Sequence, residues 1–155
     1  MDEFEKFMKL ALKQAYQAQA RGEVPVGAVV ACRGKVIGCG GNGLIGKNDP
    51  TAHAEILALR QACRRMGNYR LTGCDLVVTL EPCAMCLGAA VQARVSRIVF
   101  GAADPKAGAV SSILRFPFAK MNHRPEVLGG VLDVECGQIL KDFFKIRRGR
   151  KAGGP

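Results

Sequence analysis

Three side chains in the sequence have the chemistry and the spacing that suit a zinc ion. They are His53, Cys83 and Cys86, the last two forming a Cys-x-x-Cys pair. Imidazole and thiolate are preferred zinc ligands, and a structural zinc site would take a fourth ligand from the protein. The sequence offers no strong fourth candidate. The pattern therefore favours a catalytic site that holds one zinc ion per subunit and leaves a position open for water.

Glu55 follows the candidate histidine by two residues. A carboxylate at this position can exchange a proton with a metal-held water without binding the metal itself. Because zinc lowers the pKa of bound water from about 15.7 to about 7, hydroxide becomes available at neutral pH. The predicted chemistry is attack of this hydroxide on a substrate carbon, with Glu55 as the catalytic acid and base.

Each motif is weak evidence when taken alone. A Cys-x-x-Cys pair can be a redox centre, and a His-x-Glu tripeptide is common in proteins of many kinds. Found together in this order, with each motif opening a predicted helix, they indicate a zinc catalytic site.

The helix that should carry His53 and Glu55 is predicted from apolar residues that recur at helical spacing over 52–66. Both side chains then lie in its first turn. A strand-like run at 76–80 precedes the second motif, and Pro82 is well placed at the start of a helix.

Cys83 and Cys86 are three residues apart, so they share one face of the first turn of that second helix. The positive end of the helix dipole favours their thiolate forms. The sequence therefore predicts that two helix N-termini meet at one metal.

The remaining segments alternate between helix and strand. An amphipathic helix is expected from residue 4 to Gly22, a hairpin over 24–38, a strand at 95–100 and a final helix near the C-terminus. This alternation predicts a layered α/β fold with a mostly parallel or mixed sheet.

Two features of the loops are open to more than one interpretation. The glycines around Asn42 indicate either close approach of the backbone to another group or a flexible loop. His123 is a possible ligand, but we expect a loop histidine of this kind to make a structural hydrogen bond.

Composition places the chain among globular proteins of one domain. It has 155 residues, 48% of them hydrophobic and 23% charged, and no apolar run long enough to cross a membrane. The acidic N-terminus lacks the features of a signal peptide, so we expect a cytoplasmic protein. The predicted zinc-dependent domain spans 1–148, and a disordered basic tail is expected at 149–155.

Five of the seven cysteines lie outside the candidate metal site. Because the expected compartment is reducing, we expect them to be mostly buried thiols. They are Cys32, Cys39, Cys63, Cys74 and Cys136.

A formal net charge of +10 suggests an anionic partner. Much of the excess lies in the run 141–151. Such a run is either a solvated helix face or a surface that binds nucleic acid, and its charge alone does not decide between them.

The sequence resembles the bacterial tRNA-specific adenosine deaminases, of the cytidine deaminase-like fold. The likeness runs from about residue 4 to residue 148 and includes the order His-x-Glu then Pro-Cys-x-x-Cys, the signature of zinc nucleobase deaminases. The segments 121–124 and 142–144 are more particular to the tRNA enzymes, whereas the segment 111–120 departs from the sequence that is typical of the family.

The resemblance implies a three-layer α/β fold with a central, mixed, mostly five-stranded sheet and helices on both faces. It also implies a homodimer that converts adenosine to inosine at the wobble position of a tRNA anticodon stem-loop, typically of an arginine tRNA. Asn42 would hydrogen-bond the flipped base and Asp104 would contact the neighbouring sugar or nucleotide. The implied substrate-binding residues also include Ala54 and Ala84, and the implied contacts to the RNA backbone are Lys145, Arg147, Arg148 and Arg150.

Two other functions fit the same motifs. The site could deaminate a free base or nucleotide, such as guanine, cytosine or cytidylate. The chain could also be a zinc-stabilised RNA-binding module without catalytic activity, although Glu55 and the open fourth position on the metal count against that function.

Overall fold

The computed structural model of the protein describes residues 2–153, of which residues 150–153 are described by their backbone alone. No helix in this part of the chain is both long and apolar enough to cross a membrane. The helices are α1 (Glu3–Ala20), α2 (Leu44–Lys47), α3 (Ala54–Met66), α4 (Ala84–Gln92), α5 (Asp133–Gly153) and the short 3-10 helix η1 (Phe118–Lys120). The strands are β1 (Gly27–Cys32), β2 (Lys35–Gly41), β3 (Cys74–Leu80), β4 (Arg97–Ala102) and β5 (Glu126–Leu128).

The strands form one sheet in the order β2-β1-β3-β4-β5. β1 runs antiparallel to β2 and to β3, so the predicted hairpin is present at one edge of the sheet. β3 and β4 are parallel, as are β4 and β5. The prediction of a mixed five-stranded sheet is confirmed.

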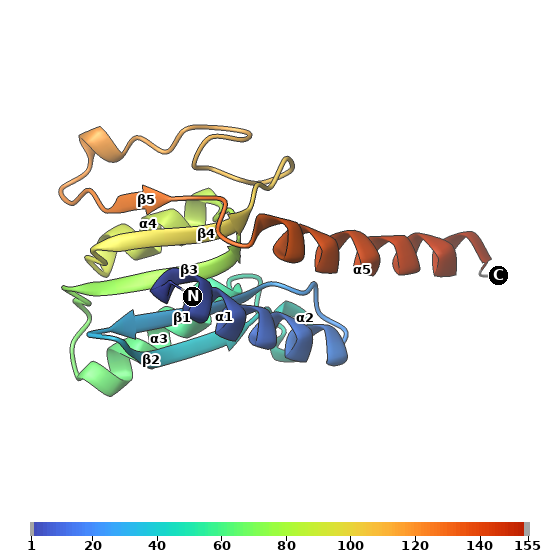
Figure 1. Cartoon of the computed structure of the whole chain (residues 1–155), viewed down its shortest axis with the longest axis horizontal. Helices are drawn as coiled ribbons and strands as arrows, with labels where there is room; N and C mark the ends of the chain where they lie inside the picture. The colour runs from blue at the N-terminus through green and yellow to red at the C-terminus, as the bar shows by residue number, and fades with distance from the viewer. Residues whose placement is uncertain (1, 154–155) are drawn as a thin grey trace.

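Helices cover both faces of this sheet (Figure 1). α1 and the first part of α5 pack on one face, against side chains such as Val29, Val77 and Val99. α3 and α4 pack on the other face, against Val30 and Leu76 among others. Because successive side chains of a strand point to opposite faces, the nearly continuous apolar runs of β1 and β3 supply both interfaces. The predicted three-layer arrangement is therefore confirmed.

Close helix packing explains the glycines of β1 and β2. A Cβ atom added at Gly38 would lie 2.4 Å from the carbonyl oxygen of Ala58 in α3. One added at Gly27 would lie 1.9 Å from the carbonyl oxygen of Ala11 in α1. Of the two interpretations of the glycine-rich segment, close backbone approach is correct, and the groups approached are helix backbones.

α5 changes character along its length. Its first turns are part of the core, with Ile139 4% exposed, whereas Ile146 is 54% exposed where the helix extends away from the sheet (Figure 1). The tail expected at 149–155 stays a prediction: the described backbone is helical to Gly153, and residues 154–155 lie outside the described residues. A single glycine such as Gly149 weakens a helix by only about 1 kcal/mol relative to alanine, so the arginine-rich run around it can stay helical.

Candidate metal centre and catalytic site

The predicted zinc ligands lie at the starts of two helices. His53 is the N-cap residue of α3 and Cys83 is the N-cap residue of α4, both with extended backbone. Cys86 lies in the first turn of α4 and is buried. Since α3 and α4 pack on the same face of the sheet, their positive ends meet at one point, as the sequence predicted.

The three donor atoms have the spacing that a zinc ion requires. Nδ1 of His53 lies 3.6 Å from Sγ of Cys83 and 3.4 Å from Sγ of Cys86, and the three atoms all lie within 4.8 Å of one another. A tetrahedral zinc with its usual Zn–N and Zn–S bond lengths would separate such a nitrogen and sulfur by about 3.6 Å. The donor set therefore fits zinc in chemistry and in distance.

Hydrogen bonds link the protonation states of these groups. The hydrogen bond with Cys86 is the main cause that lowers the pKa of Cys83 to about 4, against the effect of burial and with a further contribution from His53. The same hydrogen bond and burial raise the pKa of Cys86. The hydrogen bond with Cys83 raises the pKa of His53, again against burial. A metal that binds these three groups would release their protons, since its ligands are thiolate and neutral imidazole.

Glu55 lies in the first turn of α3 and is only 4% exposed. Burial raises the pKa of its carboxyl group above the usual value, while a backbone hydrogen bond and the charge of His53 act to lower it. A carboxyl group with a raised pKa can both accept and return a proton near neutral pH. The geometry therefore supports an acid and base role for Glu55.

Asn42 is half-buried and is held at the start of α3. Its side-chain oxygen accepts a hydrogen bond of 2.9 Å from the backbone N–H of Ala54, where the side chain of His53 makes no capping bond. The structure therefore brings Asn42, Ala54 and the His53–Glu55 turn together. Ala84 is the first residue of α4 and is exposed beside Cys83.

Glu81 is an important residue that sequence reasoning did not single out. It is 2% exposed, and its carboxylate accepts hydrogen bonds from the backbone N–H groups of residues 104, 110, 111 and 112, and from the hydroxyl of Ser112. Burial acts to raise the pKa of Glu81, but these donors outweigh it and the pKa lies below its usual value. Because Glu81 comes two residues before Cys83, it ties the loop after β4 to the metal site.

A basic groove of about 1040 Å³ lies between the loop after β4 and α5. Asp104, Arg147 and Arg148, three of the residues expected to contact RNA, line it, and Lys106 and Lys141 add to its positive charge. The backbone N–H of Asp104 donates to Glu81, so one end of the groove is joined to the segment that carries Cys83.

Two aromatic side chains of α5 contact cations that line the groove. Phe143 and Phe144 are half-buried and pack edge to face, with ring centroids 5.3 Å apart. Arg147 lies over Phe143 and Lys106 lies over Phe144. Lys145 is exposed, and the side chain of Arg150 lies outside the described part of the chain.

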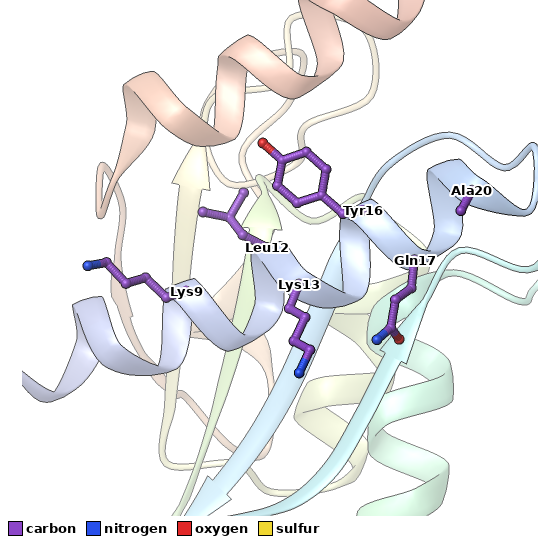
Figure 2. Close-up of a pocket in the computed structure, with 6 residues that line it drawn as sticks. All are labelled: Lys9, Leu12, Lys13, Tyr16, Gln17 and Ala20. Carbon is purple, nitrogen blue, oxygen red and sulfur yellow. The ribbon is translucent and has the colours of Figure 1, made fainter.

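A second hollow, of about 510 Å³, lies along α1 and is separate from the metal site (Figure 2). Figure 2 shows Lys9 and Lys13 pointing to different sides of α1, with Tyr16 between helix turns that carry Leu12 and Gln17. Because α1 covers the face of the sheet opposite α3 and α4, this hollow is not part of the candidate site.

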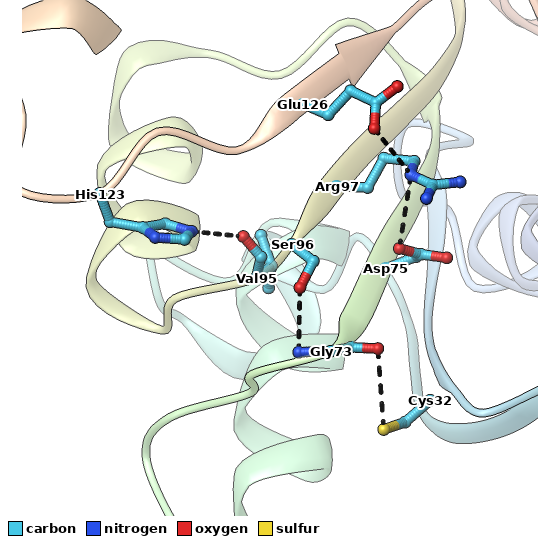
Figure 3. Close-up of polar contacts among 8 residues, drawn as sticks. All are labelled: Cys32, Gly73, Asp75, Val95, Ser96, Arg97, His123 and Glu126. Carbon is cyan, nitrogen blue, oxygen red and sulfur yellow. Dashed lines mark hydrogen bonds and ion pairs between the residues drawn. The ribbon is translucent and has the colours of Figure 1, made fainter.

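His123 makes the structural hydrogen bond that the sequence predicted. Its Nε2 donates to the backbone carbonyl of Val95 at 2.6 Å (Figure 3). This bond ties the segment before β5 to the turn before β4, so His123 stabilises the loop and is not a metal ligand.

Comparisons with known proteins agree with this site. A model of the MafB19-like deaminase family matches residues 1–148. The tRNA-specific adenosine deaminase of Haemophilus influenzae is 52% identical over 151 residues, which cover 95% of this chain and 86% of the relative.

Solved structures of similar proteins also include deaminases. A structure from a study of A-to-I editing by tRNA:A34 deaminases at the wobble position of transfer RNA has a TM-score of 0.84 and 49% identity, covering 87% of this chain and 99% of that one. A guanine deaminase from Nitrosomonas europaea has a TM-score of 0.77 and 26% identity, covering 90% of this chain and 83% of that one. The chain belongs to this deaminase family, and within it to the tRNA-specific adenosine deaminases.

Proposed function

We propose that the protein is a zinc-dependent deaminase that converts adenosine to inosine at the wobble position of a tRNA anticodon, and that it acts in the cytoplasm. The observation that carries this proposal is the set of three donor atoms at zinc spacing with a buried carboxylate two residues beyond the histidine. Such a set leaves room for water on the metal, which is the layout of a hydrolytic enzyme.

His53, Cys83 and Cys86 would hold the ion, one in each subunit. A zinc ion bound there supplies an activated water at neutral pH by lowering the pKa of that water to about 7. Glu55 accepts the proton of the attacking water and delivers it to N1 of the adenine ring. It then takes the second proton of that water, now on the C6 hydroxyl, and delivers it to the departing amino group, so that ammonia leaves and a carbonyl remains at C6.

Asn42 positions the base. Its side-chain oxygen accepts from the N–H of Ala54, which leaves its amide nitrogen to donate to the purine ring. Ala54 and Ala84 are small residues next to the ligand positions, so they leave space for a flat ring between the two helix ends.

The basic groove holds the RNA on either side of the flipped nucleotide. Arg147, Arg148, Lys106 and Lys141 would neutralise phosphates of the anticodon stem-loop, and Asp104 would contact the sugar next to the target. An anticodon loop is single-stranded, so its bases can be splayed out at the cost of partial unstacking. Lys145 and Arg150 would extend this charged surface along α5, and the substrate would be an arginine tRNA.

The proposed assembly is a homodimer. Met85, between the two candidate cysteine ligands, is 39% exposed, and Ile113 and Leu114, which follow the residues bound by Glu81, are 53% and 42% exposed. Exposed apolar side chains gathered around a site are typical of surfaces that a partner covers.

Deamination of a free base is the rival function, because the same three-layer fold serves a guanine deaminase. A free base would not need the groove of about 1040 Å³ with its four cations. The basic groove therefore favours a polyanionic substrate.

The test is to incubate the zinc-loaded protein with an arginine tRNA anticodon stem-loop and to digest the product for nucleoside analysis. We expect inosine to appear together with an equal amount of ammonia. A stem-loop with guanosine at the wobble position is the matched control and should release none. Ammonia release from free guanine or cytosine, with no inosine in the stem-loop, would show that the rival function is correct.

A further inference from the structure

A pair of cysteines lies far from the metal site, at the opposite end of β3. Cys32 is the last residue of β1, Cys74 is the first residue of β3, and the two are direct partners in the antiparallel register. Residues directly opposite each other on antiparallel strands point to the same face of the sheet. Both thiols accordingly belong to the face that α3 and α4 cover.

The backbone hydrogen bonds of Cys74 bring this pair close together. Its N–H donates to the carbonyl of Leu71, and its carbonyl accepts from the N–H of Ser96, so neither bond runs to β1. Opposite residues in such a non-hydrogen-bonded pair have Cα atoms about 4.5 Å apart. Disulfides form between Cα atoms about 4.4–6.8 Å apart, so the backbone spacing suits a disulfide without movement of either strand.

The two thiols differ in their access to solvent. Cys74 is fully buried, whereas Cys32 is half-buried and its Sγ lies 4.0 Å from the carbonyl oxygen of Gly73, the residue before Cys74 (Figure 3). Burial raises the pKa of Cys74 to about 12, with a further contribution from its hydrogen bond with Cys32. A small oxidant therefore meets Cys32 first and finds Cys74 as a protonated thiol behind it.

A third cysteine of the same face, Cys63 in α3, is engaged elsewhere. Its Sγ donates to the carbonyl of Tyr69 at 3.5 Å, in the turn that follows α3. Cys63 is also not a register partner of either strand cysteine. The cross-strand pair is therefore the favoured pairing.

We propose that Cys32 and Cys74 form a reversible cross-strand disulfide when the protein is exposed to a peroxide. The thiolate of Cys32 attacks one peroxide oxygen, the O–O bond breaks, and Cys32 becomes a sulfenic acid while water or alcohol leaves. The sulfur of Cys74 then attacks the sulfenic sulfur, its proton goes to the departing hydroxide, and water leaves as the S–S bond forms. The two thiols are oxidised by two electrons in total, and the peroxide is reduced by the same two.

Such a bond would act on stability and leave the chemistry in place. It would join β1 to β3 and enclose β2 and α3 within a covalent loop, which restricts the unfolded chain. β3 separates the pair from the metal ligands by roughly 20 Å, at about 3.3 Å per residue. We expect the melting temperature to rise by about 5–12 °C for a loop of this length in a domain of this size.

The test is to treat the zinc-loaded protein with hydrogen peroxide, alkylate the remaining thiols, and digest without reduction using trypsin and a protease that cleaves before aspartate. Because the second protease cleaves before Asp75, this digest separates Cys74 in peptide 71–74 from Cys83 and Cys86. The proposal predicts a cross-linked species of peptides 22–33 and 71–74 that a phosphine reductant separates. An alkylated Cys74 in the oxidised protein, or Cys74 joined to Cys63, would overturn the pairing.

Melting curves give a second readout with a matched control. Cys39→Ser removes another half-buried strand cysteine, whose partner in the register is Val29. The peroxide-induced rise in melting temperature should persist in Cys39→Ser and be absent from Cys32→Ser. An equal rise in Cys32→Ser would contradict the proposal, since any oxidation of Cys83 or Cys86 occurs in both variants.

Discussion

The metal centre and the basic groove differ in how much of the fold positions them. His53, Glu55, Cys83 and Cys86 lie in the first turns of helices whose remaining residues pack into the core. The cations of the groove lie mostly on the part of α5 that extends beyond the core and are exposed.

The difference matches what each region has to do. Metal ligands and a proton-transferring carboxylate must keep their places within roughly 0.5 Å, which needs support from packed side chains. Attraction between cations and phosphates acts over about 8–10 Å at physiological salt and tolerates a mobile side chain. Chemistry should therefore depend on the helix N-termini, and RNA affinity on the groove.

Loss of a metal ligand should have the largest effect. We expect Cys86→Ser to lose bound zinc and with it essentially all deamination, because a site with two strong ligands holds zinc poorly. Metal analysis of the purified variant and an inosine assay measure both. Cys39→Ser is the control and should keep one zinc per subunit. Full zinc occupancy in Cys86→Ser would show that the ligand assignment is incorrect.

Glu55→Gln should separate catalysis from binding. The substitution keeps the size and hydrogen-bonding capacity of the side chain but removes its ability to carry the proton. We expect kcat to fall by about 10²–10⁴ while zinc content and affinity for the stem-loop stay unchanged. Glu135→Gln, at an exposed position of α5, should have normal activity. Turnover close to wild type in Glu55→Gln would place the proton transfer on another group.

Removal of two groove cations should weaken binding in a salt-dependent way. If Arg147 and Arg148 each contact a phosphate, the slope of log affinity against log salt should become shallower by about 1.4–1.8 in the Arg147→Gln/Arg148→Gln variant. Arg64→Gln/Arg65→Gln is the matched control, since these exposed arginines lie in the last turn of α3, at the end away from the metal. Equal slopes in the two double variants would exclude this part of α5 as the RNA contact.

Glu81→Gln should have the smallest effect. It should loosen the connection between the loop after β4, which lines the groove, and the segment that carries Cys83. The carboxylate of Glu81 accepts from several N–H groups, and an amide nitrogen in place of one oxygen would face donors. We expect unfolding in urea to show a loss of about 1–3 kcal/mol. Glu126→Gln, on an exposed carboxylate, should cost much less. An unchanged stability in Glu81→Gln would mean that the loop after β4 does not depend on this residue.

The metal centre could be predicted from the sequence because its geometry is local. His53 and Glu55 share one helix turn, as do Cys83 and Cys86, so helical periodicity alone places each pair. That the two turns meet follows from the packing of both helices on one face of a sheet, which the alternation of helices and strands suggests.

The groove and the role of Glu81 could not be predicted in this way. Glu81 acts on backbone groups more than 20 residues away, and no periodic pattern records such contacts. Lys106 becomes a groove residue only because the loop after β4 lies beside Phe144 of α5. The end of α5 is also hard to place from the sequence, because a single glycine such as Gly149 costs a helix little and so does not mark where it stops.

The most direct test of the division between chemistry and RNA binding is a single-turnover assay at saturating stem-loop. We expect Arg147→Gln/Arg148→Gln to form inosine at a rate within about twofold of wild type once enough RNA is added, although its Kd is higher. Glu55→Gln should bind the RNA normally and remain slow at any RNA concentration. A rate in the arginine variant that stays low at saturation would contradict the account, because the groove would then take part in the chemical step.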